Sequence, residues 1–232
     1  MKVATINFSG NNGKTTIAEH VFASRMPTAL YLSVETINAG NEDVDKMRGK
    51  DYGQLQEELM MADDAIIDVG ASNVEDFMKL MKQYAGSHEE FDYFVVPAVK
   101  EHKQLEDTLA TIQALAALGI PAKKIRVVFN KVEVDDDIES EFYPLFAMHQ
   151  KNKNFTLNTG AVIQSSEIYK QLRAYKKSIP ELLDDPTDWR KKLKEAQSEE
   201  EKVTAVKMIS MKRLALSARD NLDNVYKALT SK

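Results

Sequence analysis

The 232-residue chain contains no cysteine, which excludes disulfides, thiolate metal sites and cysteine nucleophiles. Glycine and proline are also scarce, with 9 and 6 residues. No apolar run approaches the roughly 20 residues that a membrane-spanning helix needs. The first ten residues turn polar too quickly for a secretory signal and instead suit a first β-strand. We therefore expect a cytoplasmic protein without a transmembrane segment.

The composition is that of an ordinary globular protein. Apolar residues make up 43% of the chain and charged residues 29%, which is enough to build a sizeable core. The formal net charge of −5 argues against coating nucleic acid by bulk charge, although a local basic face would be compatible with it. The length suits one large α/β domain, with or without a helical appendage.

Short apolar runs alternate with helical patterns along the first 170 residues. Buried strands are predicted at 3–8, 29–34, 65–69, 93–99, 125–129 and, less regularly, 155–163. Helices are predicted at 16–25, 52–61, 74–84 and 105–118. This alternation is typical of βαβ units. We expect a three-layer α/β/α fold around a mostly parallel central sheet.

The pattern changes after residue 178, so we divide the chain into a domain at 1–178 and a helical extension at 179–232. Ser198 and Glu201 form a capping box ahead of a long helix. Its apolar residues recur at helical spacing: Met208, Met211, Ala215, Ala218, Leu222, Val225 and Leu229. This stripe predicts packing on the domain. Partner docking, a dimer contact, membrane-surface attachment and DNA contacts by Lys212, Arg213 and Arg219 are alternatives.

A candidate phosphate-binding loop at 8–16 follows the first strand directly and opens the first helix. Its backbone amides would turn toward one anion, because glycine and asparagine accept left-handed backbone angles. The residues that would supply them are Gly10, Asn11, Asn12 and Gly13. A strict loop motif has glycine at the position of Phe8, so the match is incomplete. The alternative is a plain strand–helix turn with a surface lysine.

Side chains that follow this loop suit a nucleoside triphosphate with Mg²⁺. Lys14 would bind the β- and γ-phosphates, Thr15 would offer its hydroxyl to Mg²⁺, and Thr16 would reach the α-phosphate. Asp68 ends an apolar strand, where a charge is costly without a metal or a donor, so we predict that it holds Mg²⁺. The alternative is a strand-end aspartate that caps the next turn.

Three further residues near strand ends complete the predicted site. Glu35 would orient the attacking water or the metal shell, with a plain surface glutamate as the alternative. The Gly70 amide, just after the strand of Asp68, would sense the γ-phosphate. Asn130 would read an adenine through its amide. The segment 130–133, Asn-Lys-Val-Glu, also approaches a guanine-reading pattern, but its glutamate is one methylene too long, so ATP is favoured over GTP. We therefore assign catalytic roles to Lys14, Glu35 and Asp68.

Together these motifs resemble the ParA/MinD family of P-loop ATPases, over about residues 1–170. Within it, the segments 7–16, 34–39 and 67–72 most resemble the plasmid-stability proteins called StbB, encoded beside the DNA-binding protein StbA. The resemblance implies an ATPase of plasmid maintenance or conjugative transfer, with an StbA-like partner and a homodimer. However, Ser9 occupies the position of the signature lysine on which the family's ATP-sandwich dimer depends.

Three functions are compatible with these residues. The first is a nucleotide switch that binds ATP–Mg²⁺, hydrolyses it slowly and alters a partner-binding surface. The second is a kinase or ligase for a small molecule, of the dethiobiotin-synthetase kind. The third is a nucleotide-binding module without turnover.

Overall fold

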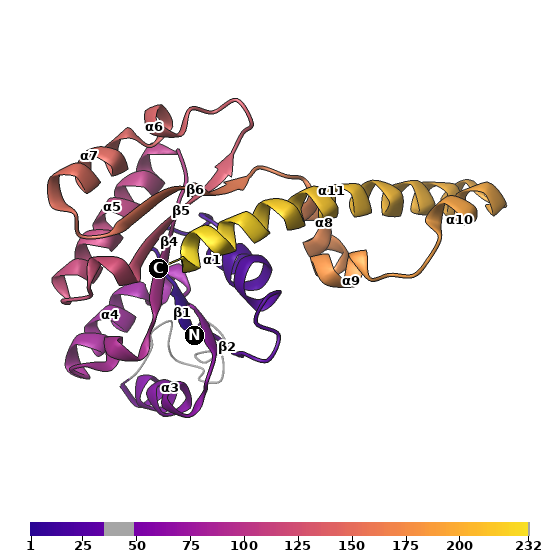
Figure 1. Cartoon of the computed structure of the whole chain (residues 1–232). Helices are drawn as coiled ribbons and strands as arrows, with labels where there is room; N and C mark the ends of the chain where they lie inside the picture. Colours follow the sequence, from indigo (N-terminus) through magenta and orange to yellow (C-terminus); the bar gives the residue numbers. More distant parts are fainter. Residues whose placement is uncertain (35–48, 232) are drawn as a thin grey trace.

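The computed structural model describes residues 1–34 and 49–231, with the backbone alone at 49 and 50. Six strands form one parallel sheet in the order β2-β3-β1-β4-β5-β6 (Figure 1). Their bounds are β1 Lys2–Thr5, β2 Leu30–Ser33, β3 Ala65–Asp68, β4 Tyr93–Ala98, β5 Ile125–Val132 and β6 Thr156–Gln164. All six expected strands are confirmed. The first ends three residues early, because the chain leaves the sheet to form the candidate loop.

Helices cover both faces of the sheet, which confirms the three-layer architecture. One face packs against α3 (Gly49–Met61), α4 (Val74–Gln83), α5 (His102–Ala117) and α7 (Tyr143–Asn152). The other packs against the helix that follows the loop and against α8 (Ile168–Tyr175), α9 (Ile179–Leu183) and α11 (Glu199–Thr230). The short α6 (Ile138–Glu141) follows β5, and α10 (Trp189–Glu195) lies beside α11.

Neighbouring residues of each central strand belong to opposite faces. Ala4 and Ile67 pack with α3, α4 and α5, whereas Val3 and Ile66 pack with the layer that contains α11. Side chains alternate across a strand, so a sheet covered on both faces needs apolar residues at successive positions. This requirement explains the continuous apolar runs in the sequence.

The helix after the loop is wider than an ordinary α-helix. It begins as α1 (Lys14–Thr16) and continues as a π-helix, η1 (Ile17–Ala23). Ser24 N donates to Glu19 O, five residues back, at 3.2 Å. Such π segments occur frequently at functional sites. The sequence pattern predicted the helix at 16–25 but did not show its widening.

The long helix α11 begins at the predicted capping box, where Ser198 and Glu201 bond each other's backbone. All seven residues of its predicted apolar stripe are buried. Asn221 fixes it to the sheet edge: its Nδ2 donates to Val162 O at 2.8 Å, and its Oδ1 accepts from Gln164 N at 3.0 Å. The other end of α11 projects from the domain beside α10 (Figure 1). The division at residue 178 stays a prediction.

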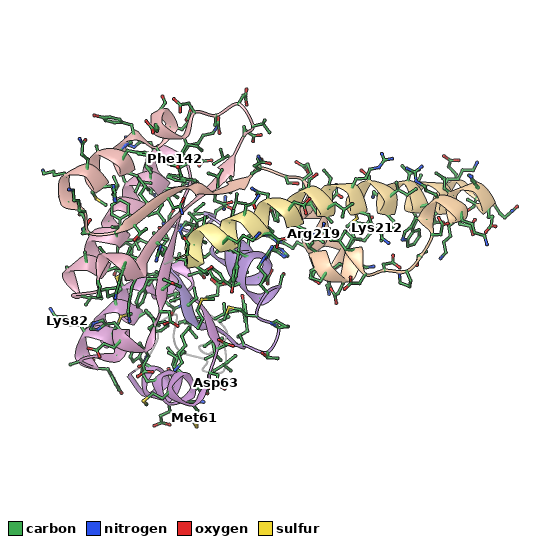
Figure 2. The ribbon with its side chains drawn as sticks, in the orientation of Figure 1. Met61, Asp63, Lys82, Phe142, Lys212 and Arg219 are labelled. Carbon is green, nitrogen blue, oxygen red and sulfur yellow. The ribbon has the colours of Figure 1, made fainter. Side chains whose placement is uncertain are left out.

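Two cations of α11 are already engaged within the chain. Lys212 Nζ donates to Asp185 O at 2.5 Å and lies 3.9 Å from the Asp185 carboxylate. Arg219 pairs with the neighbouring Asp220 at 3.0 Å. Both residues are labelled on the projecting helix in Figure 2. Across residues 1–34 and 49–231, no helix combines the length and apolarity needed to cross a bilayer.

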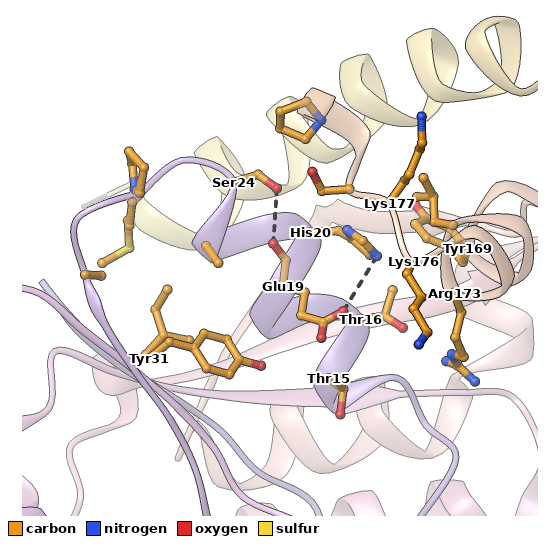
Figure 3. Close-up of a pocket in the computed structure, with 18 residues that line it drawn as sticks. Thr15, Thr16, Glu19, His20, Ser24, Tyr31, Tyr169, Arg173, Lys176 and Lys177 are labelled. Carbon is orange, nitrogen blue, oxygen red and sulfur yellow. Dashed lines mark hydrogen bonds and ion pairs between the residues drawn. The ribbon is translucent and has the colours of Figure 1, made fainter. Parts of the chain in front are cut away.

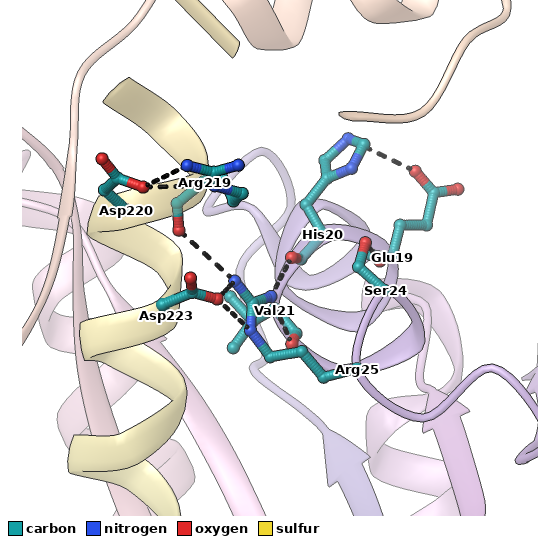
Figure 4. A network of polar contacts seen from close by, with 8 residues as sticks. All are labelled: Glu19, His20, Val21, Ser24, Arg25, Arg219, Asp220 and Asp223. Atoms are coloured by element: carbon teal, nitrogen blue, oxygen red, sulfur yellow. Dashed lines mark hydrogen bonds and ion pairs between the residues drawn. The ribbon is translucent and has the colours of Figure 1, made fainter. Parts of the chain in front are cut away.

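Arg25 joins the end of η1 to α11, and its loss should destabilise the protein (Figure 4). Its guanidinium donates to the carbonyls of His20 and Val21 at 2.8 and 2.9 Å and to the Asp223 carboxylate at 2.5 and 2.9 Å. We expect Arg25→Ala to lower the free energy of unfolding by about 2 kcal/mol, because it removes charged hydrogen bonds from a partly buried site.

Urea unfolding of the Arg25→Ala variant would measure this loss. Arg219→Ala is the matched control, because that side chain pairs with exposed Asp220 and with no other residue of the ranges 1–34 and 49–231. It should cost less than about 0.5 kcal/mol. Equal losses in the two variants would contradict a bridging role for Arg25.

Candidate functional site

Two side chains near the end of β5 bind backbone carbonyls of the loop. Asn130 Nδ2 donates to Asn12 O at 2.8 Å, and Lys131 Nζ donates to Asn11 O at 2.7 Å. In a planar trans peptide the carbonyl of one residue and the N–H of the next point in opposite directions. Because two carbonyls are drawn toward β5, the N–H groups of Asn12 and Gly13 point away from it. Two neighbouring amides of the loop are thus left without the β5 side chains as partners, as a phosphate site requires.

The backbone angles of the loop agree with this arrangement. Asn11 and Gly13 have φ values of 52° and 94°, in the left-handed region that asparagine and glycine tolerate. A Cβ added to Gly13 would lie 2.0 Å from Asn130 Nδ2, so this position has no room for a side chain. The two observations give a physical reason for Asn-Asn-Gly in the sequence.

The entry to the loop explains why Phe8 can replace glycine. Phe8 is not among the residues with positive φ, and its side chain packs on the apolar core. Its amide donates to Thr111 Oγ1 at 3.0 Å. Asn7 holds Ser9, the residue after Phe8, because its Oδ1 accepts from Ser9 N at 2.8 Å while its Nδ2 donates to Pro97 O at 2.8 Å. Side chains of neighbouring elements thus set the turn that glycine sets in the strict motif.

Asp68 lies against the first turn of the loop helix. Its carboxylate accepts from Thr15 Oγ1 at 2.7 Å and from Thr5 Oγ1 at 3.0 Å, and the residue is 5% exposed. Strand register sets this geometry, because Thr5 and Asp68 are partners in the parallel pair of β1 and β3. Lys14 is also buried, and its Nζ donates to Ser9 O at 2.6 Å. A buried cation and a buried carboxylate therefore face one loop.

A cavity of about 610 Å³ lies over the loop and suits a nucleotide with Mg²⁺. Asn12 is fully buried, and within the described part of the chain neither its amide nitrogen nor its amide oxygen has a hydrogen-bond partner. Such orphaned groups are rare and point to a ligand that satisfies them. Mg²⁺ prefers one or two protein oxygens beside substrate phosphates, as Thr15 and Asp68 would provide. No larger cluster of metal ligands occurs in the described ranges.

Most of the predicted site residues line this single cavity: Gly10, Asn11, Asn12, Gly13, Lys14, Thr15, Thr16, Asp68, Gly70 and Asn130. Glu35 lies outside the described residues, and its role stays a prediction. Asn130 has a use that the sequence did not reveal. Its amide nitrogen braces Asn12, and its oxygen accepts from Lys131 N at 2.9 Å, so reading of a base by Asn130 also stays a prediction.

The far wall of the cavity contains residues that sequence reasoning did not find. It comes from the end of β6 and from α8, and it consists of Gln164, Ser165, Ser166, Tyr169, Lys170 and Arg173. None of these residues belongs to a local motif. The parallel pairing of β5 with β6 brings the segment beside the loop, and a single sequence does not show that pairing.

His20, in η1, should make stability depend on pH. Burial, together with the smaller effect of the Arg173 charge, lowers the pKa of His20 to about 4. The unfolded histidine has a pKa of about 6.5. Between these values only the unfolded state binds the proton, so stability falls as the pH falls. We expect a loss of about 2 kcal/mol between pH 7 and pH 5.

The measurement is urea unfolding at both pH values. His20→Leu should remove most of this slope, whereas His102→Gln, a substitution at an exposed histidine, should leave it unchanged. If the His20→Leu variant kept the full slope, the pH dependence would have another source.

A strand, a loop of inward amides and a helix at the carboxyl edge of a parallel sheet define a protein of the three-layer α/β/α P-loop fold. Solved structures of this fold include MinD, a cell division protein of Aquifex aeolicus. It aligns with 100% of this chain and 97% of its own, at a TM-score of 0.59 and 11% identity.

Two further structures align at similar levels. The MinC:MinD complex of Aquifex aeolicus covers 100% of this chain and 96% of its own, at a TM-score of 0.55 and 10% identity. Apo McdA of Cyanothece aligns with 78% of this chain and 92% of its own, at a TM-score of 0.50 and 16% identity. At such identities the likeness concerns the fold alone. No protein-family model and no curated protein matches the sequence.

Proposed function

We propose that this chain is a ParA/MinD-like ATPase that binds ATP with Mg²⁺, hydrolyses it slowly and acts as a nucleotide switch. The observation that carries the proposal is the bond between Thr15 Oγ1 and Asp68 beside a loop of inward amides. A hydroxyl on the first helical turn and a carboxylate at the next strand end are the two oxygens that a P-loop enzyme presents to Mg²⁺.

Different residues of the chain would bind the phosphates, hold Mg²⁺ and sense the γ-phosphate. The amides of Asn12 and Gly13 would bind phosphate oxygens, and Lys14 would leave Ser9 O to bind the β- and γ-phosphates. Thr15 and Asp68 would hold Mg²⁺, which when bound neutralises charge on the phosphate oxygens. Gly70 lies at the same cavity, where its amide would sense the γ-phosphate.

The switch would act in the cytoplasm on a protein partner. The segment from Asp68 into η2 (Ala71–Asn73) borders the cavity, so a bound γ-phosphate would change a surface around it. MinD, which shares this fold, has been solved in complex with MinC. From the sequence resemblance we propose an StbA-like DNA-binding partner and a role in plasmid stability, positioning or conjugative transfer.

Any homodimer of this chain would differ from the ATP-sandwich form. Ser9 is 9% exposed, and its short side chain donates to the neighbouring Gly10 O at 3.2 Å, so it cannot extend to a second subunit. Gel filtration in the apo, ADP and non-hydrolysable ATP states tests this point. We expect no dimer that forms only with the triphosphate.

Release of phosphate from ATP tests the enzymatic proposal. Asp68→Asn should lower Mg²⁺-dependent release by about a hundredfold, because one negative ligand of the metal is lost. Asp64→Asn, just before β3 at its opposite end, is the matched control and should change release less than about twofold. Equal release by the two variants would exclude Asp68 from the site.

The same assay separates turnover from binding alone. No release by the wild-type chain under any condition, with partners included, would leave only a nucleotide-binding module. Parallel ATP and GTP titrations report the base preference, and we expect ATP to bind more tightly.

A small-molecule kinase or ligase is the second candidate, and one observation favours it. Such an enzyme needs cations beside a substrate pocket, and Arg173, Lys176 and Lys177 line a second cavity that adjoins the loop helix. A phosphorylated metabolite, formed from ATP in a cell extract only when the chain is present, would favour this reading over the switch.

A further inference from the structure

A second cavity of about 1020 Å³ runs along the outer face of η1 (Figure 3). Tyr31 of β2 lies on one side of it, and the segment from α8 to α9 lies on the other. It meets the nucleotide cavity at four shared residues: Thr15, Thr16, Tyr169 and Arg173. It is therefore a second cavity that adjoins the nucleotide cavity beside the phosphate loop.

Two buried polar atoms in its wall lack partners within the described ranges. They are His20 Nδ1 and the Tyr169 hydroxyl oxygen. His20 is only 8% exposed, and its ring centroid lies 5.8 Å from that of Tyr169. Burying a polar atom without a hydrogen bond is costly, so native structures rarely do so without a functional reason. A ligand in the cavity would supply the missing partners.

The side of the cavity formed by α8 is positively charged. Arg173 and Lys176 extend toward the end of the loop helix that contains Thr15 and Thr16 (Figure 3). In the part of the chain that the structure describes, neither cation donates a side-chain hydrogen bond or forms an ion pair. Lys177 adds a third cation, and among the described residues of the lining Glu19 is the one carboxylate. Burial and the nearby Asp68 carboxylate raise the pKa of Glu19, whereas the positive charge of Arg173 lowers it.

The rest of the lining is largely apolar, with Met26, Ile66, Leu172 and Pro180 among its residues. We propose that this cavity is a second ligand site, which takes a small molecule with an anionic group on an apolar body. The anionic group would bind Arg173 and Lys176, and the apolar body would lie against Met26 and Leu172. Such a mixture of apolar walls and a few convergent polar groups is typical of small-molecule sites. The proposal does not depend on nucleotide binding.

Two fluorescent probes with the same apolar body test the proposal. One is 8-anilino-1-naphthalenesulfonate, and the other is N-phenyl-1-naphthylamine, which lacks the sulfonate. We expect the sulfonate probe to bind the full chain saturably at one site. In a protein labelled at its methionine methyl groups, the NMR signal of Met26 should shift on binding, while that of Met208 on α11 should not. A Met26→Leu variant assigns the signal.

The double variant Arg173→Gln with Lys176→Asn tests the charge. Asparagine suits position 176 because the backbone there has a φ of 49°. The variant should weaken the sulfonate probe about tenfold, as expected for the loss of charged hydrogen bonds. It should leave the neutral probe within about twofold. The control pair Lys191→Ala with Lys194→Ala, on exposed α10, removes the same charge and should change neither probe.

The Lys14→Ala variant keeps this test separate from the proposed ATPase function. We expect it to bind the sulfonate probe with unchanged affinity even where it no longer binds nucleotide. The proposal is overturned if the Met26 signal stays unmoved, or if the charge variant weakens both probes equally. Displacement of the sulfonate probe by ADP–Mg²⁺ would also overturn it, because the cavity would then belong to the nucleotide site.

Discussion

Lys14→Ala should weaken ATP binding by about a hundredfold or more. Lys14 is only 8% exposed, and it lies within the phosphate loop. A preorganised cation in such a site stabilises phosphate charge far better than one in water does, because little solvent screens it. Isothermal titration with a non-hydrolysable ATP analogue gives the two affinities directly.

A second substitution at position 14 distinguishes the loss of ATP affinity caused by the missing charge from the loss caused by a disturbed loop. Lys14 also donates to Ser9 O, so its removal takes a bond out of the loop itself. Lys14→Gln keeps a donor and loses the charge, and we expect nearly the same loss of affinity. Lys103→Gln, at an exposed position of α5, should bind the analogue as the wild type does. ATP affinity of Lys14→Ala within threefold of wild type would remove the proposed site.

Gly13→Ala should lower the free energy of unfolding by about 2–4 kcal/mol and abolish nucleotide binding. The new Cβ would lie 2.0 Å from Asn130 Nδ2, at a residue with a φ of 94°. Both the steric overlap and the left-handed backbone therefore oppose alanine. Relief of the overlap would displace Asn130 from Asn12 O, so that the carbonyl that orients the Gly13 amide loses its donor. Urea unfolding and analogue titration measure the two effects.

Substitutions at other glycines separate the cost of the steric overlap from the cost of the left-handed backbone. Gly86 has a φ of 87° and open space around its Cβ position, so Gly86→Ala should cost only about 1 kcal/mol. Gly10 has open space and no positive φ, and Gly10→Ala should cost less than about 0.5 kcal/mol. The double variant Gly13→Ala with Asn130→Ala should lose less stability than the sum of its single changes. A Gly13→Ala variant as stable as Gly86→Ala would contradict the steric argument.

The sequence predicted the fold to the extent that its signals are local. The strands were visible because a sheet covered on both faces requires unbroken apolar runs, such as 65–69. The same runs concealed which side chain belongs to which face, since Val3 and Ala4 are equally apolar. The short α9 was missed although Ser178 and Glu181 form a capping box that the sequence displays.

In the candidate site, too, the sequence revealed the residues with local signals and missed those that depend on packing. Positions 8–16 form one continuous segment, and Asp68 stands out as a charge in an apolar run, so the sequence pointed to both. The α8 wall did not stand out, and the bond from Lys131 to Asn11 was not predicted, because only the packing of distant segments brings these residues to the loop. The use of Asn130 as a brace likewise depends on its distance from Asn12, which no spacing in the sequence encodes.

The long helix α11 can amplify small movements. Its 32 residues correspond to a rod of about 48 Å, of which the portion near Leu222 packs on the sheet while the other end projects. Arg25 ties the rod to the helix that follows the phosphate loop. A tilt of only about 5° at that tie would displace the distant tip by about 3 Å, given a rise of 1.5 Å per residue. A shift too small to reshape the nucleotide cavity would therefore be magnified at the tip, where it would alter the contacts of any partner bound there.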